Sequence, residues 1–148
     1  MKKITYITLL LILILPGCSS DDKYRANYDF PGNVWNRFDN PMIEFNIKDP
    51  GIYYDMFLTL DYVSSPERQN FTITVIMTTP SGEVRSRDLE LDFGQGKEVK
   101  GHQRLSIVLR REYAFADKGK CRFEVENRSS EVNTEGMKSI GIFMRKAQ

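Results

Sequence analysis

The chain has 148 residues, with 21 basic side chains, 20 acidic side chains, one histidine and two cysteines. If the first 17 residues are a leader that is removed, 131 residues remain, which is enough for one domain with a hydrophobic core. The leader contains Lys2 and Lys3, so the remainder carries 19 basic and 20 acidic residues. This balance, without a basic patch or an acidic tail, argues against a nucleic-acid partner.

Residues 1–17 have the pattern of a bacterial lipoprotein leader. Two lysines precede an apolar run at residues 4–15, which is shorter than the roughly 20 apolar residues that span a bilayer. The sequence Leu15-Pro16-Gly17-Cys18 follows and resembles a lipobox, in which a diacylglycerol is attached to the cysteine. We therefore predict cleavage between Gly17 and Cys18 and lipidation of Cys18. The alternative is an ordinary secretory signal with an incidental cysteine.

The residues after Cys18 predict a subcellular localisation and a linker. Ser20, Asp21 and Asp22 resemble the acidic tag that sends Bacteroidetes lipoproteins to the outer face of their outer membrane, although a solvated linker is the alternative. Ser19, in place of Asp, argues against retention at the inner membrane. We therefore predict a lipid-anchored protein of the outer membrane. Residues 18–33 are predicted to be a linker, and residues 34–148 the folded domain.

Period-two alternation dominates the rest of the chain. Strands are predicted at residues 42–47, 53–63, 71–78, 84–93, 105–111, 121–126 and 139–144, separated by turn sequences such as Asp49-Pro50-Gly51. In the second of these, Asp55, Thr59 and Asp61 fall on the face predicted to meet solvent. In residues 84–93, Val84 is at an even position, whereas the next apolar residue, Leu89, is at an odd one. This change of face predicts a bulge near Arg87.

These elements predict the fold class. Short alternating strands without an amphipathic helix to cover a sheet indicate a single antiparallel β-sandwich, of jelly-roll or Ig-like type. Cys121 alternates with Phe123 and Val125, which predicts a buried thiol in place of a reactive one.

No catalytic, cofactor or metal site is predicted. His102 is the only histidine, lies in the Gly- and Lys-rich segment GQGKEVKGH, and is expected in a solvated loop. One histidine and Cys121 do not make a zinc site, and no serine lies in a nucleophile elbow. GQGKE lacks the spacing of a phosphate-binding loop.

Two weaker possibilities concern binding. Asp88, Glu90 and Asp92 share one strand face and form a carboxylate row, which is also what a solvent-facing strand looks like. Four aromatic residues could stack on a glycan if they converged on one surface: Trp35, Tyr53, Tyr62 and Tyr113. Packing in the core is the default expectation for Trp35 and Tyr62. This leaves a surface glycan-binding lipoprotein as the alternative function.

The order of the segments resembles the GldH-type gliding-motility lipoproteins of Bacteroidetes. The similar segments are VWNRFDNPMIEFNIKDPGIYYDMFLTLDY, NFTITVIMTTPSG, LELDF, LSIVLRREYAFADKGKCRFEVENR and EGMKSIGIFMRKA, and the last of these contains Gly136 and Gly141. The chain departs from the family pattern at Asp61, at the turn SSPERQ, and in DFGQGKEVKG, which has no tryptophan.

This resemblance implies a non-enzymatic envelope lipoprotein associated with gliding and protein secretion. Only Cys18 transfers as a functional residue. The expected partners are the membrane, through the lipid anchor, and other envelope lipoproteins or motility and secretion proteins. The polar segments 64–70 and 94–101, or an exposed strand edge, are the predicted contact surfaces.

Overall fold

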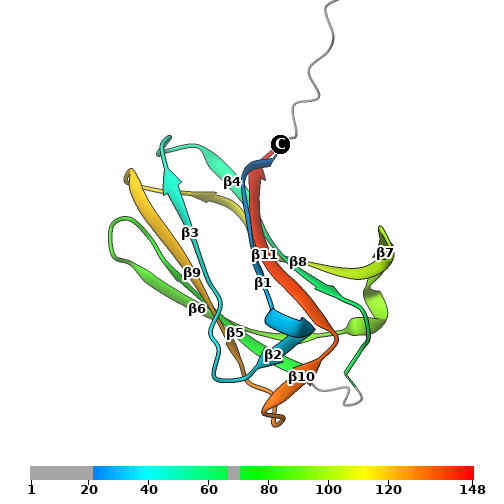
Figure 1. Ribbon diagram of the computed structural model, residues 1–148. Helices are drawn as coiled ribbons and strands as arrows, with labels where there is room; N and C mark the ends of the chain where they lie inside the picture. Colours follow the sequence, from blue (N-terminus) through cyan, green and yellow to red (C-terminus); the bar gives the residue numbers. More distant parts are fainter. Residues whose placement is uncertain (1–21, 67–70) are drawn as a thin grey trace, which may run out of the picture.

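The computed structural model describes residues 22–66 and 71–148, which form two packed antiparallel sheets (Figure 1). The strands are β1 (Asp22–Asp29), β2 (Val34–Asn36), β3 (Met42–Ile47), β4 (Tyr53–Tyr62), β5 (Phe71–Thr78), β6 (Val84–Leu91), β7 (Lys97–Val99), β8 (His102–Ala114), β9 (Gly119–Asn127), β10 (Asn133–Glu135) and β11 (Met137–Lys146). Two short 3-10 turns are η1 (Pro31–Asn33) and η2 (Phe93–Gln95). The all-β prediction is confirmed.

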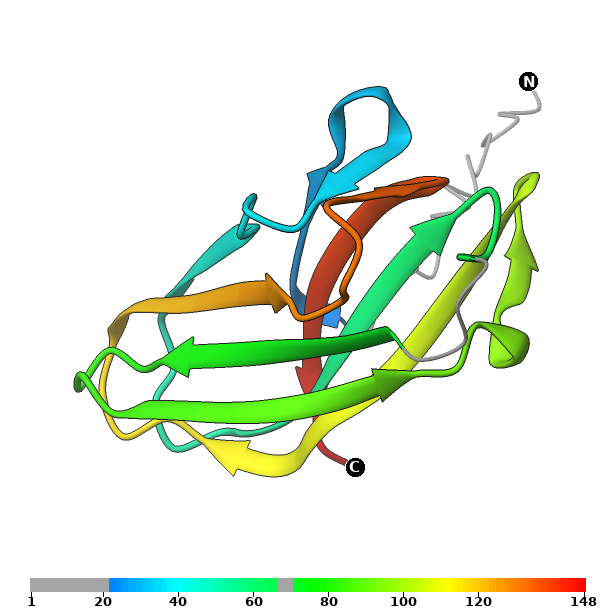
Figure 2. The same ribbon diagram turned by 90° about the horizontal axis from the view of Figure 1, so that it is seen from below.

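The strand order is that of a jelly roll. The five-stranded sheet has the order β1-β11-β4-β8-β7, the four-stranded sheet has the order β3-β9-β5-β6, and β2 pairs with β10. The chain changes between these two sheets from β3 to β4, from β4 to β5, from β6 to β7 and from β8 to β9, so most consecutive strands lie in different layers (Figure 2). This crossing pattern decides between the two predicted sandwich types in favour of the jelly roll.

The four-stranded sheet has the predicted alternation. In β5 every second side chain is buried, from Phe71 to Met77, and the threonines between them are half-exposed. The core extends to the β2–β10 end, where Trp35 is fully buried. Its ring stacks on Phe30 with the centroids 4.8 Å apart, and its Nε1 donates to the Asp39 carbonyl at 3.0 Å. Trp35 is therefore a core residue.

The central strand β4 is buried on both faces, where alternation predicted burial of one. The polar residues predicted to face solvent are only 7%, 6% and 7% exposed: Asp55, Thr59 and Asp61. Long side chains from neighbouring strands cover this outer face. Phe143 of β11 stacks on Phe57 at 4.6 Å between centroids. The guanidinium of Arg25 lies 4.5 Å from the Phe143 ring centroid, and that of Arg145 lies 4.8 Å from the Phe57 centroid.

The predicted linker at residues 18–33 is wrong over most of its length. β1 pairs with β11, with Asp29 opposite Ser139, so this segment is the edge of the five-stranded sheet. Tyr24, Ala26 and Tyr28 are half-buried against the core. The alternation is weak in the sequence because alanine and tyrosine, in place of aliphatic side chains, hold the inward positions. The folded domain therefore includes residues 22–33 and does not begin at residue 34.

Two other local predictions are corrected. β6 has no bulge, because its register with β5 is unbroken from Val84 to Leu91. The parity shift arises because Val84 faces outward and the inward positions at this end of β6 are arginines. Segment 94–101 is not a plain loop, since it contains part of η2 and all of β7, which pairs with the start of β8.

Two glycines of the closing segment allow close approaches of the chain to itself. Gly136 has φ +82°, and a Cβ there would meet the Ser64 carbonyl oxygen at 2.8 Å as well as the Ser64 hydroxyl. A Cβ on Gly141 would meet the side chains of Asn27 and Thr59 on the adjacent strands. Both glycines belong to the closing segment that carried the family resemblance, so their role in the described residues is packing.

Candidate functional site

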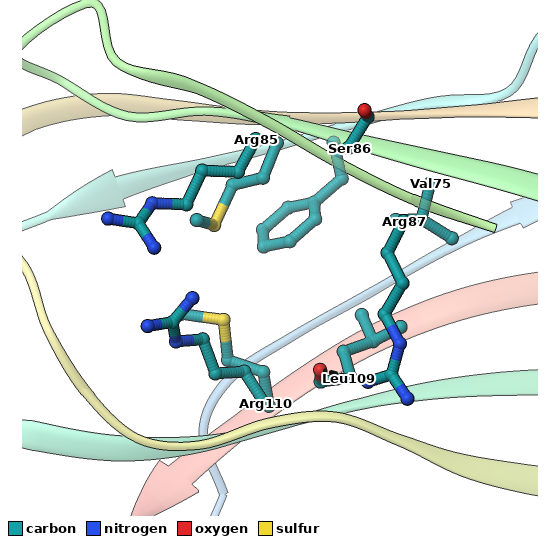
Figure 3. A pocket seen from close by; sticks show the side chains of 9 residues that line it. Val75, Arg85, Ser86, Arg87, Leu109 and Arg110 are labelled. Carbon is teal, nitrogen blue, oxygen red and sulfur yellow. Dashed lines mark hydrogen bonds between the residues drawn. The ribbon is translucent and has the colours of Figure 1, made fainter. Parts of the chain in front are cut away.

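An open groove lies between β6 and β8, where the two sheets leave their edges unjoined. Its volume is about 460 Å³, and its floor consists of five apolar side chains: Met56, Val75, Met77, Leu109 and Phe123. The rim carries Arg85 and Arg87 from β6 and Arg110 from β8 (Figure 3). The guanidinium groups of Arg85 and Arg110 lie on the same side of the groove, and Arg87 lies on the other (Figure 3).

The groove exists because both bordering strands are edges. Within the described residues, β6 pairs only with β5, and β8 pairs on one side only beyond Arg104. Arg87 spans the gap and donates to the Leu109 carbonyl at 2.7 Å. Leu109 is an extra residue in β8, since Phe57 pairs with Val108 while Met56 pairs with Arg110. This bulge protects the edge from continuous pairing with another strand.

The three arginines differ in their partners. Arg85 forms an ion pair with Glu83 at 2.6 Å. Arg110 lies 5.0 Å from the Tyr113 ring centroid and, within residues 22–66 and 71–148, has no carboxylate within ion-pair distance. Guanidinium groups above an apolar floor suit a ligand that combines an anionic group with an apolar one.

A second hollow lies at the β2–β10 end. It is lined by Ser64, Ser65 and Pro66, which begin one predicted contact segment, and by residues of the β9–β10 connection such as Ser130 and Glu131. The remaining residues of that segment, 67–70, lie outside the described residues. The part that is described is polar and largely exposed.

A buried charge cluster was missed by sequence reasoning. The Asp61 carboxylate accepts from Arg104 through two bonds of 2.6 and 2.8 Å, and the Nε2 of His102 lies 3.1 Å from Asp61 Oδ2. The His102 and Asp61 side chains are only 10% and 9% exposed, so the prediction of a solvated His102 is wrong. Register explains the cluster, because Asp61 lies opposite Arg104, and His102 is two positions away on the same face.

The cluster sets the ionisation of Asp61. Burial raises the pKa of this carboxyl, but the hydrogen bonds and positive charge of Arg104, together with His102, outweigh burial and hold the pKa below its usual value of 3.8. A lowered pKa in the folded state means that the ionised carboxylate stabilises the fold above pH 3.8, and that this contribution is lost as the pH falls through the folded-state pKa.

Asp61→Asn should therefore destabilise the domain by about 1–3 kcal/mol at neutral pH, because Arg104 and His102 lose their charged acceptor. The difference in the free energy of unfolding between wild type and variant should shrink as the pH falls below 3.8. Urea denaturation at neutral pH and at acid pH measures both quantities. A difference that stays constant with pH would show that the carboxylate charge is not the cause.

The predicted carboxylate row does not form a site. Asp88 accepts from Thr74 at 2.6 Å on the exposed face of the four-stranded sheet. Glu90 is exposed on the same face. Asp92 caps η2 by accepting from the Gly94 amide at 3.0 Å. None of the three lines either hollow, and within the described residues no group of three potential metal ligands comes together.

The four aromatic residues do not converge either. Trp35 and Tyr62 are buried in the core, and the Tyr62 hydroxyl donates to the Phe93 carbonyl at 2.6 Å. Tyr53 is exposed, whereas Tyr113 is half-buried and packs edge-on against Phe115 at 5.0 Å. Tyr113 lies opposite Tyr54, the neighbour of Tyr53, so Tyr53 and Tyr113 point to opposite faces of the sheet. The glycan alternative loses the surface on which it depended.

The predicted processing residues cannot be placed. Gly17, Cys18, Ser20 and Asp21 lie outside the described residues, and Asp22 is the first residue of β1. The other cysteine, Cys121, is fully buried in β9, and burial raises the pKa of its thiol to about 12. This agrees with the predicted packing role.

Comparison with known proteins identifies one family. The family described as GldH lipoprotein matches residues 22–144. No curated protein matches the chain. Among solved structures, TmCBM61 in complex with β-1,4-galactotriose is 15% identical, with 83% of this chain and 67% of that chain covered and a TM-score of 0.35. The infectious bursal disease virus VP2 subviral particle is 11% identical, with 82% and 30% covered and a TM-score of 0.36.

This chain therefore spans about two thirds of the first of these structures and under a third of the second. Similarity at these scores says nothing about what this chain binds.

Proposed function

The chain belongs to the GldH lipoprotein family, and we propose that it is a non-enzymatic accessory component of the gliding-motility and secretion-associated machinery. It is held at the outer membrane by lipid on Cys18 and acts by protein–protein contact. The family match over residues 22–144 carries this proposal. Within the described residues, no helix is long and apolar enough to cross a membrane. In this proposal the lipid on Cys18 provides the attachment. Two or more acyl chains hold a protein stably where one does not.

The start of β1 sets the length of the tether. Only residues 19–21 separate Cys18 from Asp22, so a lipid on Cys18 holds the first residue of β1 within about 14 Å at full extension. This is much shorter than the reach of the linker predicted at residues 18–33. A short tether keeps the domain beside the membrane and raises its effective concentration near membrane-bound partners.

The described parts of the proposed contact segments, residues 64–66 and 94–101, lie away from this tether. β4 begins beside the end of β11, where β1 starts, and it ends at Tyr62, two residues before Ser64. Figure 1 shows β2 and β10 at the opposite end of the sandwich from the start of β1. Segments 64–70 and 94–101 therefore follow the far ends of β4 and β6, where a membrane-tethered domain presents its loops to other proteins.

The proposal is tested by cross-linking in living cells, followed by purification through a C-terminal tag. The tag suits this purpose because the C-terminus lies beside the start of β1 and leaves the far-end loops free (Figure 1). We expect envelope or secretion proteins in the cross-linked material, and their loss when the exposed Ser65 and Glu98 are replaced by arginine.

Asn46→Arg, on the exposed face of β3, is the matched control and should leave the cross-linked products unchanged. Recovery of only lipid and polysaccharide, or equal loss in loop and control variants, would contradict a role based on protein contact at these segments.

A further inference from the structure

The charges of the sandwich are segregated along its length. We define the anchor end as residues 24–25, 44–56, 79–85, 110–122 and 143–148, which surround the start of β1. Register places them together: β11 ends beside the start of β1, β4 begins beside the ends of β11 and β8, and β5 ends beside the start of β9. Figure 1 shows the β3–β4 and β8–β9 connections at this same end.

The anchor end is basic. It contains ten basic residues and six acidic ones, whereas the remainder of residues 24–66 and 71–148 contains seven basic and eleven acidic residues. The anchor end therefore carries a net charge of +4, and the rest of these residues carries a net charge of −4. Such a separation orients a molecule in the field of a charged surface.

Several acidic residues at the anchor end are already neutralised. Asp55 accepts from Arg111 at 3.0 Å, Glu83 pairs with Arg85, and Glu44 lies 3.5 Å from Lys120. By contrast, three exposed lysines have no carboxylate within ion-pair distance among the described residues: Lys48, Lys118 and Lys146. Their charge is available to an external anion.

An exposed tyrosine lies at the same end, beside the strand that ends at Lys146. Tyr53 is 60% exposed, and its carbonyl accepts from the Ala147 amide at 2.9 Å, which fixes it beside the end of β11. Tyrosine is enriched at membrane interfaces, where its ring sits at the level of the headgroups. A basic surface with an exposed tyrosine is therefore the composition expected of a face that meets an anionic bilayer.

We propose that the anchor end of the sandwich rests on the anionic lipid headgroups of the leaflet that holds the anchor. This deepens the proposed function and rests on it, since the short tether from Cys18 brings this end, and no other, to the membrane. Lys48, Lys118 and Lys146 contact headgroup phosphates, Tyr53 inserts at the interface, and the acidic remainder of the domain faces away from the bilayer.

The test is co-sedimentation of the non-lipidated mature chain, carrying Cys18→Ser, with lipid vesicles. We expect binding to vesicles that contain about 30 mol % phosphatidylglycerol in phosphatidylcholine, loss of binding at about 1 M salt, and no binding to phosphatidylcholine alone. Lys48→Glu/Lys118→Glu/Lys146→Glu should weaken partitioning at least about tenfold.

The matched control is Lys97→Glu/Lys100→Glu/Lys138→Glu, which reverses the charge of three exposed lysines at the other end of the same sheet. It produces the same change in net charge. It should alter binding by less than about twofold, because these residues lie beyond a Debye length from the surface. Circular dichroism and thermal unfolding confirm that both triple variants are folded.

Equal weakening by the two triple variants, or no binding of the wild type to anionic vesicles, would overturn the proposal. Binding in which only the anchor-end variant loses affinity supports it. The assay contains no anchor and no protein partner, so its failure leaves the lipidation of Cys18 and the protein-contact role untouched. Loss of those properties in cells would likewise leave the vesicle result standing.

Discussion

Leu58→Asp should abolish the cooperative unfolding transition of the domain. Leu58 is fully buried at the centre of β4, between Ile142 of β11 and Ile107 of β8 in the sheet register. The change removes an aliphatic side chain, which costs about 2–5 kcal/mol, and places a carboxylate where no cation or donor is available, which adds several kcal/mol. The sum is comparable to the roughly 5–15 kcal/mol that stabilises a typical domain.

The measurement is urea denaturation followed by tryptophan fluorescence, since Trp35 is buried in the same core. Thr78→Asp is the matched control, because Thr78 lies on the outer face of β5 opposite Arg122 and should change stability by no more than about 0.5 kcal/mol. A Leu58→Asp protein with a wild-type transition would show that β4 is not the centre of the core.

Cys18→Ala should release the protein from the membrane fraction. The predicted thioether-linked lipid is the attachment that the proposed function requires, and each buried methylene of an acyl chain contributes about 0.8 kcal/mol to membrane binding. Fractionation after a high-salt wash, which removes electrostatically bound protein, should find wild type in the membrane pellet and the variant in the supernatant.

Cys121→Ala provides the control, because Cys121 is the only other cysteine and is fully buried in β9. It should remain in the pellet and should incorporate labelled fatty acid like the wild type. Incorporation of label into Cys18→Ala, or its persistence in the washed pellet, would place the attachment elsewhere in the chain.

The elements that could be predicted are those whose two faces differ strongly. β3 and β5 begin and end where the alternation of residues 42–47 and 71–78 placed them, because each has an aliphatic or aromatic face toward the core and a polar face toward solvent. β1 was not predicted, because its inward positions carry tyrosine and alanine among charged residues. Its pairing depends on β11, more than 100 residues further along the chain.

The candidate surfaces divide in the same way. Lipidation at Cys18 is a local motif and can be predicted without a fold. The arginine groove could not be, since it arises where β6 and β8, two strands of different sheets, leave their edges unpaired. The Asp61–His102–Arg104 cluster likewise depends on register between β4 and β8, which no local pattern encodes.

The sequence by itself determined the all-β class, the family and the predicted localisation, because the alternation and the leader motif can each be recognised within a few neighbouring residues. The tertiary structure alone decided the jelly-roll order, the place of residues 22–29 in the sheet and the burial of Asp55 and Asp61. It also decided that basic residues gather at the anchor end. These features depend on which strands become neighbours, and that choice is made by long-range pairing and by the side chains that neighbouring strands place over one another.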